Sequence, residues 1–149
     1  MAEILKIRWN TDVEQEFFNV TNSVGKKGVN GKNDVFLVQA MLRELPDNKR
    51  GGLSRRDCPL ATGTFDKKTE NVIRKYQGCH KREKIARDCL INHARSQFVP
   101  GTKRPWTIIQ LNADLMEYYM IAGVGGSLTE NYQAYLLDKY PELSVMLLS

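Results

Sequence analysis

Cysteine and histidine are the side chains of this sequence best suited to metal binding or nucleophilic chemistry. Four of them lie close together in the chain: Cys79, His80, Cys89 and His93. Two cysteines with two histidines are a common zinc set, and a spacing of four places Cys89 and His93 on one helical face. Cys79 and His80 are neighbours, however, and adjacent side chains point apart in helices and strands alike. The pattern therefore favours buried thiols with surface histidines, and we predict no metal and no other cofactor.

Nucleophilic and hydrolytic chemistry find little support in the residue pattern. Cys89 with His93 is the pair to test for a cysteine nucleophile. Neither His80 nor His93 lies in an H-x-x-E-H or H-E-x-x-H pattern, and a catalytic zinc needs about three protein ligands. Sugar hydrolysis needs two carboxylates flanking the bond, but we interpret Glu44 and Glu117 as helix surface. We therefore expect a binding protein, and not an enzyme.

Size and charge place the chain among ordinary globular domains. Its 149 residues, 42% hydrophobic and 26% charged, are enough to bury a core without disulfides, and three cysteines form no disulfide framework. Residues 43–87 hold thirteen Lys/Arg against six Asp/Glu, whereas residues 105–149 hold one against five. Such a basic middle could attract an anionic polymer. No recognition helix, zinc finger or aromatic platform accompanies it, so the sequence disfavours nucleic acid as the partner.

The periodicity of apolar residues predicts two extended segments followed by helices. Residues 3–9 alternate apolar and polar side chains as a half-buried strand does, and residues 16–25 are a second extended segment. A helix capped by Asn33 or Asp34 is expected to end before Pro46. Gly63 suits a tight turn, after which Asp66 caps the next helix. The expected helices span residues 34–45, 67–77, 106–123 and 130–140, with a basic loop between the first two and glycines at 123–126.

Two segments carry motifs that occur together in a known family. Residues 23–45, SVGKKGVNGKNDVFLVQAMLREL, contain DV..VQ..L, and residues 61–77, ATGTFDKKTENVIRKYQ, contain G.F...T...I..YQ. Together they resemble the two hallmark stretches of the peptidoglycan-binding-domain family, and residues 87–92 and 106–112 are weaker counterparts. The matching residues are Asp34, Val35, Val38, Gln39, Leu42, Gly63, Phe65, Thr69, Ile73, Tyr76 and Gln77. A charged insertion at residues 48–59 departs from the family pattern.

The resemblance implies a mainly α fold built on a compact three-helix bundle over residues 23–112. A short extended or β arm over residues 1–22 precedes the bundle, and a helical extension over residues 113–149 follows it. The family's function implies noncatalytic binding of bacterial cell-wall peptidoglycan, through its glycan or its stem peptides. Aromatic faces would stack on sugar rings, polar groups would meet hydroxyls, and cations would meet stem-peptide carboxylates.

The candidate ligand-binding residues lie near the hallmark helices. They are Arg43, Thr62, Gly63, Thr64, Arg74, Lys75, Tyr76 and Gln77. Tyr76 can equally be a core aromatic, and the cations can equally be solvated surface. Carbohydrate binding and a purely structural role for these residues are therefore both open.

The expected location of the protein in the cell bears on the choice between peptidoglycan binding and an alternative function. The sequence has no apolar run of about 20 residues and no secretory signal, so we expect no membrane partner and a cytoplasmic protein as synthesised. To reach peptidoglycan, the protein would then require export by a non-Sec route. The alternative is a protein–protein adaptor or assembly component of a phage-tail-like or type VI secretion-like system. It would keep the fold without sugar binding and could contact its partner through residues 113–149.

Overall fold

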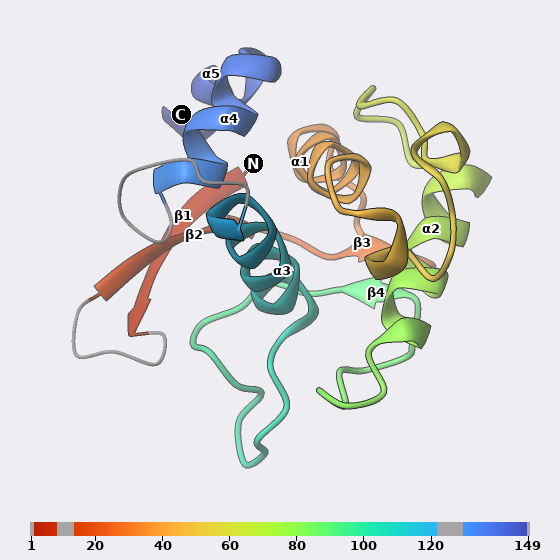
Figure 1. The fold of residues 1–149 in the computed structure, drawn as a ribbon, viewed down its shortest axis with the longest axis vertical. Coiled ribbons are helices and arrows are strands. Elements are labelled where there is room, and N and C mark those ends of the chain that lie inside the picture. The colour runs from red at the N-terminus through yellow and green to blue at the C-terminus, as the bar shows by residue number, and fades with distance from the viewer. Residues whose placement is uncertain (1, 9–13, 122–129, 149) are drawn as a thin grey trace.

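The computed structural model describes residues 2–8, 14–121 and 130–148 (Figure 1). Along the chain its strands and helices are β1 (Ala2–Arg8), β2 (Glu14–Val20), β3 (Val24–Gly25), α1 (Lys32–Arg43), α2 (Lys67–Cys79), β4 (Leu90–Ile91), α3 (Thr107–Ile121), α4 (Glu130–Lys139) and α5 (Glu142–Leu148). Two short 3-10 helices, Asp47–Lys49 and Arg55–Asp57, lie between α1 and α2. Among the helices so described, none is long and apolar enough to cross a membrane.

The helices α1, α2 and α3 lie where the hydrophobic periodicity predicts them, within about two residues at most ends. The cap of α2 is confirmed, because the Asp66 carboxylate accepts a 2.8 Å hydrogen bond from the Thr69 backbone N–H. The predicted cap of α1 is wrong. That helix starts after Gly31, and Asp34 lies in its first turn, where its carboxylate accepts hydrogen bonds from the backbone N–H groups of residues 21 and 22.

The prediction of a mainly α three-helix bundle is wrong, since the described residues form a mixed α/β fold with five α-helices and two antiparallel sheets. β1 pairs along its whole length with β2, and β3 pairs with β4. The predicted N-terminal arm is a hairpin because Phe17, Phe18 and Val20 are fully buried and so need a partner strand and a covering layer. Figure 1 shows this hairpin and α2 on opposite sides of α3.

One hydrophobic core runs through all three predicted segments of the chain. Phe17 comes from the hairpin, Ile73 from α2 and Ile108 from α3, while Tyr132 and Leu143 come from the C-terminal helices. Pro141 ends α4 as predicted, but a further helix, α5, follows it and packs on β1. The sequence did not predict α5, since the last expected helix spans residues 130–140. The glycines predicted to end α3 lie outside the described residues.

The side chain of Asn112 joins α3 to the backbone of the hairpin. Its Oδ1 accepts from the Phe18 N–H at 2.9 Å, and its Nδ2 donates to the Phe18 carbonyl at 2.8 Å. Oδ1 also accepts from the Tyr132 hydroxyl at 2.6 Å. A fully buried carboxamide therefore replaces the neighbouring strand that β2 lacks on this edge.

Replacing Asn112 with leucine should lower the free energy of unfolding by about 3 kcal/mol, because a buried N–H and carbonyl of residue 18 lose their partner. Urea unfolding followed by circular dichroism measures this change. The exposed Glu117→Ala substitution on the same helix is the control and should stay within about 0.5 kcal/mol of the parent. A loss below about 1 kcal/mol for Asn112→Leu would show that the fold does not depend on this bridge.

Candidate functional site

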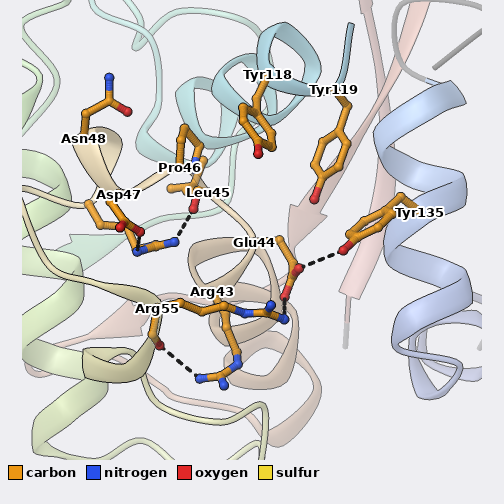
Figure 2. A pocket seen from close by; sticks show the side chains of 11 residues that line it. Arg43, Glu44, Leu45, Pro46, Asp47, Asn48, Arg55, Tyr118, Tyr119 and Tyr135 are labelled. Atoms are coloured by element: carbon orange, nitrogen blue, oxygen red, sulfur yellow. Dashed lines mark hydrogen bonds and ion pairs between the residues drawn. The ribbon is translucent and has the colours of Figure 1, made fainter. Parts of the chain in front are cut away.

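A pocket of about 560 Å³ opens between the C-terminal end of α1, the C-terminal half of α3 and α4 (Figure 2). We call it the tyrosine pocket. Its lining residues are Arg43, Glu44, Leu45, Pro46, Asp47, Asn48, Arg50, Arg55, Tyr118, Tyr119 and Tyr135. Cavities that hold small ligands have about this volume, with aromatic walls and a few placed polar groups.

Three tyrosines form the wall contributed by α3 and α4. The rings of Tyr118 and Tyr119 meet edge to face at 5.0 Å, and Tyr119 lies 4.6 Å from Tyr135. Tyr118 is 43% exposed and Tyr135 is 38% exposed, whereas Tyr119 is buried behind them. Burial, followed by the hydrogen bond with Tyr135, raises the pKa of Tyr119, so its hydroxyl stays protonated. The wall therefore offers two accessible aromatic rings held in place by a buried third.

The carboxylate of Glu44 lies at the base of the pocket, in contrast to the helix-surface position interpreted from the sequence. Its Oε2 accepts from the Arg55 guanidinium at 2.9 Å and from the Tyr140 hydroxyl at 2.7 Å. Its Oε1 accepts from Lys139 Nζ at 2.9 Å and from the Tyr135 hydroxyl at 3.3 Å. Glu117, by contrast, is exposed as expected.

These partners fix the charge of Glu44. Burial alone would raise the pKa of this carboxyl group. Hydrogen bonds from Tyr140 and Lys139, together with the positive charges of Lys139 and Arg55, outweigh burial and hold the pKa of Glu44 below its usual value. The carboxylate is therefore ionised at neutral pH and is a poor proton donor.

Arginines from α1 and the inserted loop shape the other wall. Arg50 is buried, and its Nε donates to the Leu42 carbonyl at 3.1 Å while its guanidinium also bonds Leu45 O and Asp47. It thereby satisfies carbonyl groups that the end of α1 leaves unpaired. Arg43 donates to the carbonyls of Arg55 and Cys58 at 3.2 and 3.1 Å and so anchors the second 3-10 helix. These bonds hold the inserted loop against the pocket.

Of the binding residues predicted from the sequence, Arg43 lines the tyrosine pocket and the others do not. The turn of Thr62, Gly63 and Thr64 is held by Gln39, whose Oε1 accepts from the N–H groups of Thr62 and Gly63 at 2.9 Å. Gly63 has a φ of 83°, and a Cβ there would lie 2.7 Å from Cγ of Lys32. The predicted need for glycine at this turn is therefore confirmed.

Tyr76 and Gln77 are buried parts of the framework. The Tyr76 hydroxyl donates to Asp114 at 2.8 Å. The Gln77 side chain accepts from the Cys89 N–H at 2.8 Å and donates to the Leu90 carbonyl and the Thr107 hydroxyl at 3.1 Å. Tyr76 is thus the core aromatic that the sequence analysis kept as its alternative.

Arg74 and Lys75 lie on the exposed face of α2. The Arg74 guanidinium is 3.4 Å from the Glu70 carboxylate, an exposed pair of the kind that contributes little to stability. The predicted residues therefore divide into the turn at residues 62–64, the buried pair of residues 76 and 77, the surface cations and Arg43. Sequence reasoning missed Tyr118, Tyr119 and Tyr135 as pocket residues because it took its candidate binding residues from the motif segments and considered residues 113–149 only as a contact for a protein partner.

A second polar cluster surrounds His80, which is buried, although the sequence analysis favours a surface histidine. Its Nδ1 lies 3.0 Å from the Glu83 carboxylate, and its Nε2 lies 2.8 Å from Asp114, off the line of a straight hydrogen bond. Asp114 also accepts from Tyr76 and from Gln110. Burial alone would lower the pKa of His80, but the two carboxylates raise it above its ordinary value.

The cysteines and the second histidine lie in other surroundings. His93 Nδ1 contacts the Val20 carbonyl at 2.7 Å and Glu3 at 3.1 Å. Its partners therefore differ from those of His80, which are Glu83 and Asp114. Cys58 and Cys89 are buried, Cys79 is half-buried, and all three are free thiols. Within the described part of the chain no three His, Cys, Asp or Glu side chains gather into a metal-binding group.

The protonation of His80 should make stability depend on pH. Because its folded-state pKa lies above the ordinary value of 6.5, the stabilisation is complete below pH 6.5 and is lost as pH rises through the folded-state pKa. The difference in unfolding free energy between the parent and His80→Gln should therefore shrink as pH rises from about 5.5 to about 8.5. Urea unfolding at a series of pH values measures it, with the exposed Arg74→Gln substitution as the control. A difference that stays constant with pH would contradict a charged His80.

Comparison of the chain with protein-family models, with curated proteins and with solved structures finds no match. The family resemblance of the two hallmark segments stays a prediction.

Proposed function

We propose that the protein is a noncatalytic binding module for bacterial peptidoglycan fragments, and that the tyrosine pocket is its ligand site. The observation that carries this proposal is the pairing of exposed rings, Tyr118 and Tyr135, with the arginines Arg43 and Arg55 around one cavity. Sugar rings pack their apolar faces on aromatic side chains, and stem peptides carry carboxylates that arginine binds. Both kinds of group are covalently joined in peptidoglycan.

The charge of the pocket supports an anionic ligand. Its lining holds three arginines against Glu44 and Asp47, a net charge of +1 from this arithmetic. Asp47 is paired with Arg50 at 2.6 Å, and Glu44 already accepts from four donors. Arg55 is half-exposed at the side chain, so its remaining N–H groups can reach a ligand. A ligand carboxylate entering the pocket could therefore pair with Arg55, because both acids of the pocket already have partners.

The same arrangement supports binding without catalysis. A glycosidase needs one carboxyl group kept protonated by an apolar setting and a second that stays ionised. Glu44 has the opposite environment, since its hydrogen-bond donors and neighbouring cations lower its pKa. Asp47 is exposed and tied to Arg50. Neither acid of the pocket is held as a proton donor.

Retention on insoluble purified peptidoglycan tests this function. Tyr118→Ala should weaken binding about ten-fold, because the accessible ring at the mouth of the pocket is lost. Phe98→Ala is the matched control: Phe98 is 40% exposed, close to the 43% of Tyr118, but lies outside the pocket. Arg74→Ala, a charge control on α2, should also leave binding unchanged. Sedimentation with increasing peptidoglycan, followed by quantification of the unbound protein, gives the affinities.

Two results would overturn the proposal. One is a parent protein that stays wholly in the supernatant yet runs as a defined complex with another protein, which would favour the adaptor alternative. The other is equal weakening by Tyr118→Ala and Phe98→Ala, which would show nonspecific adsorption. Thermal unfolding of each variant establishes that the comparison is made between folded proteins.

A further inference from the structure

A hollow of about 510 Å³, separate from the tyrosine pocket, lies between the loop after α2 and the loop before α3. We call it the cationic hollow. It is lined by Arg82, Glu83, Lys84, Thr102, Lys103 and Arg104. Four positive side chains therefore face one negative side chain across two loops that are distant in sequence.

The first loop is held by the buried His80 cluster. The His80 carbonyl accepts from the Lys84 N–H at 3.2 Å, which closes a turn, and Ile85 anchors the turn in the core. Lys84 has a φ of 57°, which is uncommon for a residue with a side chain. Glu83, the one acid of the hollow, lies 3.0 Å from His80. The Glu83 carboxylate is therefore paired with the histidine beneath the loop and forms no ion pair with the four cations among the described residues.

The second loop is a hairpin closed by its own hydrogen bonds. The Val99 N–H donates to the Arg104 carbonyl at 2.9 Å, and the Thr102 hydroxyl donates to the Val99 carbonyl at 2.8 Å. Thr102 Oγ1 also accepts from the Arg104 N–H at 3.1 Å. Lys103 and Arg104 are therefore carried on a defined turn, which reduces the ordering needed to bind a ligand.

The cations of the hollow have no partner among the residues that the structure describes. The side chains of Arg82, Lys84, Lys103 and Arg104 form no ion pair or hydrogen bond there, and all four residues are exposed. Like charges gathered around a cavity repel one another, and a multivalent anion relieves that repulsion. Phosphate oxygens accept several such donors at once.

From this geometry we propose that the cationic hollow binds a polyphosphate group, either free or as the phosphate end of a small ester. The four cations match the charge of a di- or triphosphate, and the volume suits a small ligand and not a polymer. A smaller hollow of about 220 Å³ shares Thr102 and Arg104 with it and is lined further along by Val99, Pro105 and Trp106. An organic group attached to the phosphates has apolar surface to occupy there.

Isothermal titration calorimetry with inorganic pyrophosphate tests the proposal, at about 20 mM NaCl so that screening stays weak. We expect saturable binding to the parent protein and about ten-fold weaker binding to Lys103→Glu/Arg104→Glu. The charge-matched control, Lys26→Glu/Lys68→Glu, changes exposed lysines outside the hollow and should shift the affinity less than about two-fold. Adenosine diphosphate is the second probe. Tighter binding than pyrophosphate identifies an ester as the ligand, and equal or weaker binding identifies the free anion.

Three outcomes would overturn the proposal. The first is no saturable pyrophosphate binding up to about 1 mM. The second is equal weakening by the two double variants, which would show general attraction to a basic protein. The third is a single-stranded oligonucleotide that binds far more tightly than pyrophosphate and is weakened by both double variants, which would indicate a nucleic-acid surface. None of these outcomes bears on Tyr118 or on peptidoglycan retention, so this site and the proposed function fail independently.

Discussion

The buried carboxylate of Glu44 is the interaction on which the arrangement of the site depends. A carboxylate removed from water at the end of α1 is costly unless donors and cations surround it. The chain meets this requirement with Arg55 from the inserted loop and with Lys139 and Tyr140 from the end of α4. One acid therefore draws together segments that are about 95 residues apart in sequence. The tyrosine pocket is the space that this convergence leaves open.

Buried carboxamides perform the same task in the framework. Gln39 holds the turn before α2, Gln77 joins α2 to β4 and α3, and Asn112 occupies the open edge of β2. Each can donate and accept at once without carrying a charge, so each satisfies two kinds of backbone group at little desolvation cost compared with an ion. Gln39 and Gln77 belong to the motifs and have polar side chains that could bind a ligand, but they are buried because they bond the backbone of the framework.

The sequence predicted α1, α2 and α3 well because caps, glycines and apolar spacing are local signals. Asp66 caps α2, and Gly63 has the positive φ expected of it. The prediction of the fold class was wrong for two reasons. The two N-terminal extended segments were predicted from periodicity but were assigned to an arm and not paired with each other as β1 and β2. The pairing of β3 with β4 joins Gly25 to Leu90, a non-local contact that periodicity does not encode. The helix α5 was missed because Pro141 ends one helix and also permits the next one to begin.

The candidate site could not be predicted from motif residues, because it is built largely from parts of the chain outside the motifs. The residues that resemble a family pattern supply the core and the turns, as Tyr76 and Gln77 show. The pocket takes Arg50 and Arg55 from the insertion and Tyr135 from the C-terminal extension. The pocket is therefore lined mostly by residues that no motif singles out, and Arg43 is the one candidate binding residue from the sequence that it includes.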